Sequence, residues 1–194
     1  MENKLYLILL LGVFFVSCVE EEFYVPKPRG YARIDLQKDR DFKKHKFNCG
    51  FKAELPSYAR LEKKTGSQHC AENILVDNHK AEVWLTYYAV DSLDLLFRDA
   101  YNSLDKENVR ASRFNDSVIN IKENNVYGYA YELEGDAGCN FQFFVTDSVD
   151  HFLRGSLHFY TRPNYDSLYP VINHMREDIY HMIETIEWSK DSIQ

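Results

Sequence analysis

The sequence predicts an α+β fold, a mostly antiparallel sheet of roughly six to eight strands with two main helices packed on it. Phe141–Thr146 and His151–Thr161 have the composition of strands, and the tight connection Asp147–Asp150 makes them a β-hairpin. After Pro163, apolar residues recur at steps of three and four, as on one stripe of a helix. These residues are Leu168, Val171, Ile172, Met175, Ile179, Met182, Ile183 and Ile186. A helix with such a stripe must cover a sheet.

The N-terminal segment Met1–Ser17 has the layout of a secretory signal. Its apolar run, Leu5–Val16, is too short to span a bilayer comfortably. The run ends directly before Cys18 in a sequence that resembles the lipobox of bacterial lipoproteins, with Phe15 in place of the usual Leu. We therefore expect Cys18 to become the first mature residue and to carry acyl chains such as palmitate, each buried methylene contributing about 0.8 kcal/mol to anchoring. The alternative is an ordinary cleaved signal with a cysteine nearby.

The rest of the chain divides into a tether, one domain and a tail. Residues 18–30 contain two prolines and should be extended. The acidic run Glu20–Glu22 has two interpretations. It could be a solvated linker, or it could be an export signal, because it resembles the acidic residues that send lipoproteins to the outer face of the outer membrane. Residues 31–190 suffice for a single α+β domain, and residues 191–194 form the tail. The formal net charge of −7 argues against nucleic acid as a partner.

In the first part of the domain we expect strands at Tyr31–Leu36, Phe47–Leu55, His69–Val76 and Ala81–Ala89. Residues 37–46 form a charged loop between the first two strands. Its basic residues could contact lipid headgroups, but the interleaved acids favour a solvated loop. A turn after Val76 makes the last two strands a hairpin.

Cysteine pairing is favoured in an exported protein. With Cys18 lipidated, three cysteines remain, and one of them must stay free. We expect Cys49 to pair with Cys70, a bridge that would contribute about 3 kcal/mol, and Cys139 to be the spare. Spacing alone does not decide this partition.

The second part of the domain begins with a helix that is capped by Asp91 or Ser92. Its apolar stripe comprises Leu93, Leu96, Phe97, Ala100, Tyr101 and Leu104. Two strands follow, Phe114–Glu123 and Val126–Leu133. Three tyrosines of the second strand, Tyr127, Tyr129 and Tyr131, fall on one face. They could stack on sugar rings, but packing within the sheet is the favoured interpretation.

Two groups of polar residues are candidates for function. On the last helix, His174, Asp178 and His181 share a stripe and are ligand types suited to zinc, although no established metal motif supports a site, and we expect no metal or other cofactor. The same helix should present Glu177 and Asp178 to solvent as a partner-binding surface. Arg154 could pair with an acid of a neighbouring strand or bind a partner.

Three blocks of the sequence together resemble the gliding motility lipoprotein GldD family of Bacteroidetes. They are Tyr24–Leu36, then Gln142–Ser148 with His151–Leu157, and finally Arg162–Asn164, Asp166–Leu168, Pro170–Ile172, Arg176–Ile179 and Glu184–Trp188. The resemblance implies an envelope lipoprotein of the outer membrane that is needed for gliding, a machinery coupled to type IX secretion. It supplies no catalytic residue. The order of the last elements also resembles a Mog1/PsbP-like sandwich, by analogy of fold alone.

Three functions therefore remain open. The first is a noncatalytic lipoprotein that supports assembly or stability of the gliding and type IX secretion machinery, whose envelope proteins would be its partners. The second is a module that binds glycan or lipopolysaccharide on the tyrosine face. The third is a hydrolase, against which the sequence around Ser156 argues because it lacks the glycines of a nucleophile elbow.

Overall fold

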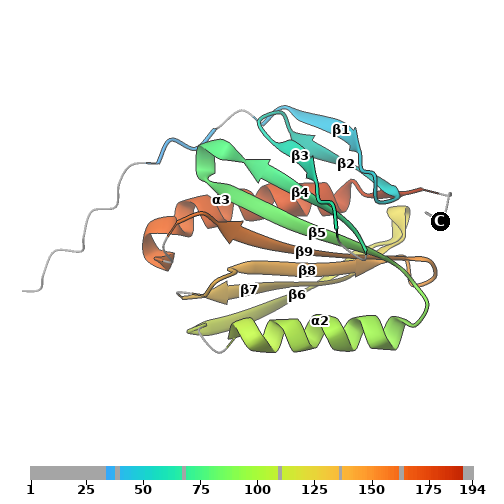
Figure 1. The fold of residues 1–194 in the computed structure, drawn as a ribbon. Coiled ribbons are helices and arrows are strands. Elements are labelled where there is room, and N and C mark those ends of the chain that lie inside the picture. Colours follow the sequence, from blue (N-terminus) through green and yellow to red (C-terminus); the bar gives the residue numbers. More distant parts are fainter. Residues whose placement is uncertain are drawn as a thin grey trace, which may run out of the picture. The chain divides into compact units, whose positions relative to one another are not determined.

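The computed structural model describes residues 34–37, 40–66, 69–108, 111–135, 137–161 and 164–189. The expected signal peptide, Cys18 and the tether lie outside these residues. The described part contains two helices and two antiparallel sheets, one of 7 strands and one of 3 (Figure 1), so the predicted α+β class is confirmed. The likeness to the Mog1/PsbP sandwich stays a prediction.

The large sheet has the strand order β3-β4-β5-β9-β8-β7-β6, and every neighbouring pair is antiparallel. The strands are β3 (Arg60–Lys63), β4 (Cys70–Val76), β5 (Ala81–Ala89), β6 (Arg113–Ile121), β7 (Val126–Glu134), β8 (Phe141–Thr146) and β9 (His151–Phe159). The 3₁₀ turns Asp77–His79 and Lys122–Asn124 close the hairpins β4–β5 and β6–β7. The predicted hairpin β8–β9 is present, and the carboxylate of Asp147 accepts hydrogen bonds from three backbone amides of its turn.

The small sheet was not predicted. It consists of β1 (Phe42–Lys46), β2 (Phe51–Pro56) and the two-residue strand β10 (Glu187–Trp188), in the order β1-β2-β10. β1 lies within residues 37–46, which were expected to form a charged loop, so that prediction is wrong for the strand. The backbone of β1 pairs with β2, while its lysines face solvent. The strand expected at Tyr31–Leu36 is wrong for its described residues, since 34–36 are not in a strand. The short edge strand β3 was expected to be part of a loop.

The long helix α3 (Tyr165–Glu184) begins at Asn164, whose side chain accepts a hydrogen bond from the amide of Ser167. It covers one face of the large sheet and also contacts β2 of the small sheet. Met175, Ile179 and Met182 are at most 3% exposed and join the main core. Helix α3 is therefore buried on two sides, against both sheets.

Helix α2 (Leu93–Asn108) lies on the opposite face of the large sheet (Figure 1). A second, smaller core forms there from Ala100 and Leu104 of the helix and from Tyr131, Phe144 and Phe152 of the strands. Strand residues that point to this face alternate with those of the main core, as the twofold period of a strand requires. In the described part of the chain, no helix is long and apolar enough to cross a membrane.

Cys49 and Cys70 form a disulfide bond that joins the turn before β2 to the start of β4, with an S–S distance of 2.08 Å. This is the expected pair. The buried carboxylate of Glu72 accepts hydrogen bonds from the backbone and side-chain nitrogens of Asn48, at 2.7 and 2.5 Å. The bridge and these bonds fasten the small sheet to the large one. Cys139 lies outside this bridge; it is buried, and its thiol donates to the carbonyl of Phe141 at 3.1 Å.

Candidate functional site

The predicted charged outer face of α3 is wrong for its central residues. His174 is 5% exposed and Asp178 is 4% exposed, whereas the side chain of Glu177 is 53% exposed. The physical reason is the small sheet, because the chain on either side of β1 and β2 brings Arg40 and Tyr58 over this part of the helix. Asp178 is therefore not available as a partner-binding residue.

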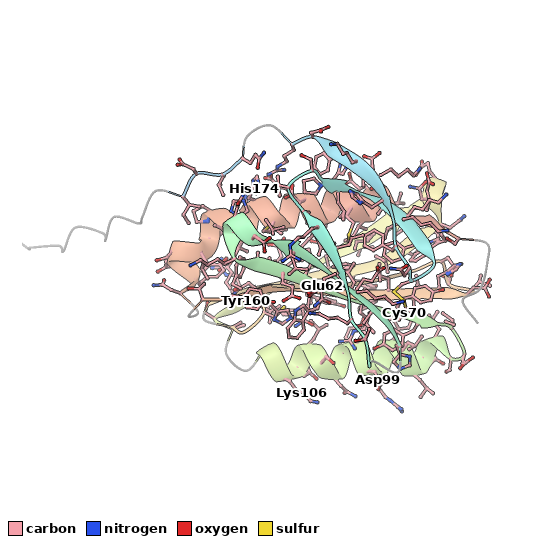
Figure 2. The ribbon with its side chains drawn as sticks, turned by 45° about the horizontal axis from the view of Figure 1, so that its top comes forward. Glu62, Cys70, Asp99, Lys106, Tyr160 and His174 are labelled. Carbon is pink, nitrogen blue, oxygen red and sulfur yellow. A yellow bond between two sulfur atoms is a disulfide. The ribbon has the colours of Figure 1, made fainter. Side chains whose placement is uncertain are left out.

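We call this group the α3 polar cluster. Hydrogen bonds and an ion pair join Arg40, Tyr58, His174, Glu177 and Asp178, and the ring of His79 packs edge-on against the rings of Tyr58 and His174. Arg40 contacts Nδ1 of His174 at 2.7 Å and Oε2 of Glu177 at 2.7 Å, and its Nε lies 3.3 Å from Oδ1 of Asp178. The hydroxyl of Tyr58 lies 3.0 Å from Nε2 of His174 and donates a short hydrogen bond to Oδ2 of Asp178. Figure 2 labels His174 on α3.

The donors of the cluster fix the protonation of His174. Because a guanidinium can only donate, Nδ1 of His174 must accept from Arg40, which leaves the ring proton on Nε2. Nε2 then donates to the oxygen of Tyr58, whose own proton goes to Asp178. The contacts thus form one continuous chain of donors and acceptors with a neutral imidazole and an ionised carboxylate.

Burial perturbs the pKa of four residues of the cluster, Tyr58, His79, His174 and Asp178. It lowers the pKa of His174, as does the nearby Arg40, and it lowers the pKa of His79, whose ring lies 5.3 Å from that of His174. Burial also raises the pKa of Asp178, although the bond from Tyr58 and the charge of Arg40 oppose this rise. The pKa of Tyr58 is raised by burial and by its bond to Asp178. The cluster therefore resists gaining or losing a proton at His174 and Tyr58.

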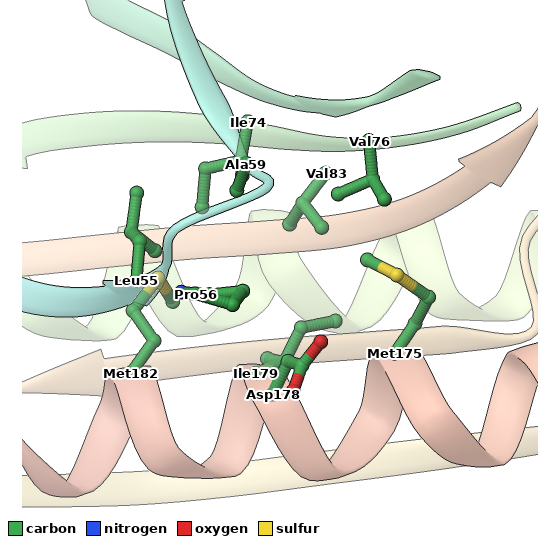
Figure 3. A pocket seen from close by; sticks show the side chains of 10 residues that line it. All are labelled: Leu55, Pro56, Ala59, Ile74, Val76, Val83, Met175, Asp178, Ile179 and Met182. Atoms are coloured by element: carbon green, nitrogen blue, oxygen red, sulfur yellow. The ribbon is translucent and has the colours of Figure 1, made fainter. Parts of the chain in front are cut away.

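A small cavity lies beside Asp178 (Figure 3). Figure 3 shows Met182 of α3 pointing toward Leu55 and Met175 pointing toward Val76 and Val83, with Ile179 and the carboxylate of Asp178 between them. The cavity volume is about 10 Å³, enough for about one water molecule and no larger ligand. Among the residues that the structure describes, Oδ1 of Asp178 has no hydrogen-bond partner, and its nearest cation is Nε of Arg40 at 3.3 Å. The α3 polar cluster is therefore a closed internal network rather than an open substrate site.

The residues considered for zinc do not converge. Both ring nitrogens of His174 are engaged by Arg40 and Tyr58. His181 points to the small sheet, where its ring stacks on Phe42 at 3.7 Å and its Nε2 lies 2.8 Å from Glu54. Among the residues that the structure describes, no group of three or more His, Cys, Asp or Glu side chains could hold a metal ion.

Arg154 lies on the α2 side of the large sheet, in register with Thr86 of β5 and Phe144 of β8. It is half-buried, and within the described ranges it makes no ion pair. The expected pairing with an acid of a neighbouring strand is therefore wrong. Its cross-strand neighbours carry a hydroxyl and a phenyl ring instead of a carboxylate.

Of the tyrosine row of β7, Tyr131 packs within the protein, as the favoured interpretation had it, whereas Tyr127 is half-buried and Tyr129 is exposed. Tyr131 is 4% exposed and contacts the rings of Tyr101 on α2, Phe114 on β6 and Phe144 on β8. Helix α2 thus covers Tyr131, one part of the surface on which a sugar was considered. Tyr129 at the margin is 36% exposed.

Sequence reasoning missed the partners that α3 finds outside the helix. Tyr58 and Arg40 lie 116 and 134 positions from His174 in the chain and belong to no periodic pattern.

A signal for a second aromatic surface was present in the sequence, because the alternation along β5 places Trp84 on the face opposite to the main core. Trp84 is 48% exposed.

Comparison with known proteins places the chain in a family. Residues 21–188 match the family model described as gliding motility lipoprotein GldD, and this match covers both sheets and both helices. No curated protein matches the chain. The family implies a role in gliding motility and suggests a lipid-anchored protein of the cell envelope. The chain belongs to the gliding motility lipoprotein GldD family.

Proposed function

We propose that this protein is a noncatalytic lipoprotein of the outer membrane, anchored through Cys18, that supports the assembly or stability of the gliding and type IX secretion machinery. The observation that carries the proposal is the family match over residues 21–188, which includes the whole described domain. The anchor and the domain then act together, one by holding the protein at the membrane and the other by contacting envelope proteins.

The use of the polar side chains supports a binding role. Arg40, His174, Tyr58 and Asp178 contact one another through hydrogen bonds and an ion pair, and the cavity beside them is too small for a substrate. Such a buried network stabilises one arrangement of α3 against the small sheet. The domain is thereby held as a rigid surface for contacts with other proteins.

The length of the tether permits contacts at a distance from the membrane. If the tether of residues 18–30 were fully extended, it would reach at most roughly 45 Å. Of the residues considered for partner binding, Glu177 and Arg154 remain candidates, because Glu177 is exposed and Arg154 is half-exposed.

The proposal is tested by depleting the protein in gliding cells and following the machinery over time. We expect the other envelope components of the machinery, measured by quantitative mass spectrometry, to decrease or to leave their large complexes before gliding stops. Re-expression of the wild type should restore both, and Cys18→Ala, which cannot be lipidated, should not. Loss of gliding with fully assembled components at normal levels would contradict the proposal.

A further inference from the structure

Helix α2 covers only part of its face of the large sheet, and a second surface lies beyond it on β3, β4, β5 and β9. The α2 core involves Phe144 of β8 and Phe152 at the start of β9. Further along the same face, Trp84 of β5 is in register with Asn73 of β4 and Ser156 of β9. Figure 2 labels Glu62 and Tyr160 near this region and Asp99 and Lys106 on α2.

A pocket of about 360 Å³ opens on this surface, in the size range of small-ligand sites. Its polar floor consists of Glu82, which is 1% exposed, and Asn73, which is 5% exposed. The amide nitrogen of Asn73 donates a short hydrogen bond to Oε1 of Glu82. Nζ of Lys64 lies 3.6 Å from the same oxygen. A buried carboxylate that is oriented by an amide and faced by an ammonium group makes a preformed hydrogen-bonding floor.

Two exposed aromatic side chains line the pocket above this floor. One is Trp84, whose ring stacks on His158 with 4.0 Å between ring centroids, and Nε2 of His158 lies 2.9 Å from the hydroxyl of Ser156. The other is Tyr160, which is 63% exposed and whose amide donates to the carbonyl of Lys80 at 2.9 Å. The indole of Trp84 is thus packed against His158 on one side, and because the residue is 48% exposed, the rest of the ring is accessible to a ligand.

We propose that this pocket, which we call the Trp84 pocket, binds a saccharide unit. The apolar face of a sugar ring can pack on the exposed indole, while its hydroxyls can donate to a carboxylate and accept from an amide or an ammonium group. The floor excludes an acyl chain, for which a buried carboxylate is unfavourable. Lys64 is shared between the carboxylates of Glu82 and Glu62, at 3.6 and 2.6 Å, and this excess of negative charge disfavours a phosphate. Thr86 adds a hydroxyl to the lining.

Two envelope polymers could supply such a sugar, the polysaccharide of lipopolysaccharide and the glycan strand of peptidoglycan. The experiment uses the purified protein from residue 19 onward, which lacks only the expected signal peptide and Cys18, and its variant Trp188→Phe, which leaves Trp84 as the single tryptophan. Delipidated polysaccharide, soluble glycan fragments with their peptides and the free peptides are titrated separately while tryptophan fluorescence is recorded. Circular dichroism of each variant verifies that it is folded.

We expect a saturable change in Trp84 fluorescence with one of the two glycans and none with the free peptides. By isothermal titration calorimetry, Trp84→Ala and Glu82→Gln should each weaken binding roughly tenfold or more. Tyr169→Ala should not, because Tyr169 is an equally exposed aromatic residue, 50% exposed, on α3. No change with either glycan would overturn the proposal. A change reproduced by the free peptides alone, or undiminished binding to folded Trp84→Ala, would overturn it as well.

Discussion

The hydroxyl of Tyr58 donates its hydrogen bond to the buried carboxylate of Asp178, 120 positions away in the sequence. The bond joins the segment after β2 to the middle of α3, and Arg40 and His174 complete its surroundings. It converts a helix face that the sequence presents as polar into an internal contact between the small sheet and the helix.

Removal of this hydroxyl should destabilise the protein. Tyr58→Phe leaves Asp178 buried with one hydrogen bond fewer, which should lower the free energy of unfolding by about 1–3 kcal/mol. Chemical denaturation of the purified domain gives this value. Tyr160→Phe is the matched control, because Tyr160 is 63% exposed and should change stability by less than about 0.5 kcal/mol. Equal stability of the two variants would show that the bond contributes nothing.

The two histidines of the α3 polar cluster predict a loss of stability in mild acid. Burial lowers the pKa of His79 and His174 below the ordinary 6.5, so the unfolded chain takes up protons first as the pH falls. Their stabilising contribution is fully present above pH 6.5 and is lost as the pH falls through their folded pKa values. The raised pKa of Asp178 acts in the opposite sense, because its contribution is present at low pH and is lost as the pH rises through its folded pKa.

Substitution separates these opposing effects. His174→Gln should be less stable than the wild type at pH 7.5 and should lose less further stability between pH 7 and pH 5. Denaturation curves at the two pH values test this difference, with His181→Gln on the same helix as the control. A wild type whose unfolding free energy rises on acidification over this range would show that Asp178 outweighs the histidines.

The disulfide should contribute measurably to stability. It closes a loop with a sequence separation of 21, so replacing both Cys49 and Cys70 by Ala should cost about 3 kcal/mol. The melting temperature of the wild type should fall on addition of a reducing agent. That of the double variant should not respond, which separates the bridge from any effect of the reductant on Cys139. A wild type unaffected by complete reduction would contradict this prediction.

Gly155 permits close packing of a ring on the sheet. A Cβ at this position would lie 2.1 Å from Cε1 of Phe143, which is itself only 2% exposed and has little room to move. Gly155→Ala should therefore lower the free energy of unfolding by about 1–3 kcal/mol through overpacking. In a double-mutant cycle, Phe143→Leu should recover part of this loss. Gly128→Ala should show no such recovery when it is combined with Phe143→Leu, because its clash is with the backbone carbonyl of Phe144. Additive effects of Gly155→Ala and Phe143→Leu on the free energy of unfolding would contradict this explanation.

Charge on α3 should act differently at buried and exposed positions in cells. Ile179→Asp places a charge in the core, where Ile179 is 3% exposed, and should deplete the protein and abolish gliding together. Glu177→Lys should leave protein abundance nearly normal, since its exposed ion pair with Arg40 contributes little, while weakening a partner contact and slowing gliding. Immunoblots and gliding speed in the same strain measure both. Normal gliding of Glu177→Lys would remove this residue from the partner surface.

The sequence alone was sufficient where a pattern repeats locally. The period of three and four along α3, the alternation along β8 and β9, and the turn at Asp147 each depend on neighbours in the chain, and each element is found as predicted. The pairing of Cys49 with Cys70 was chosen among open alternatives, and only the tertiary structure brings these residues together.

Tertiary structure decided the environment of the polar residues. The small sheet has few apolar residues in β1 and only two residues in β10, so pairing partners rather than local pattern stabilise its strands. By closing over α3, it buries His174 and Asp178, whose spacing on the helix resembles that of a solvated stripe. The alternation along β5 separated Trp84 from the main core, but it could not show that α2 would cover Tyr131 and leave Trp84 exposed. Periodicity determines which side chains share a face, whereas packing between distant segments determines which faces meet water.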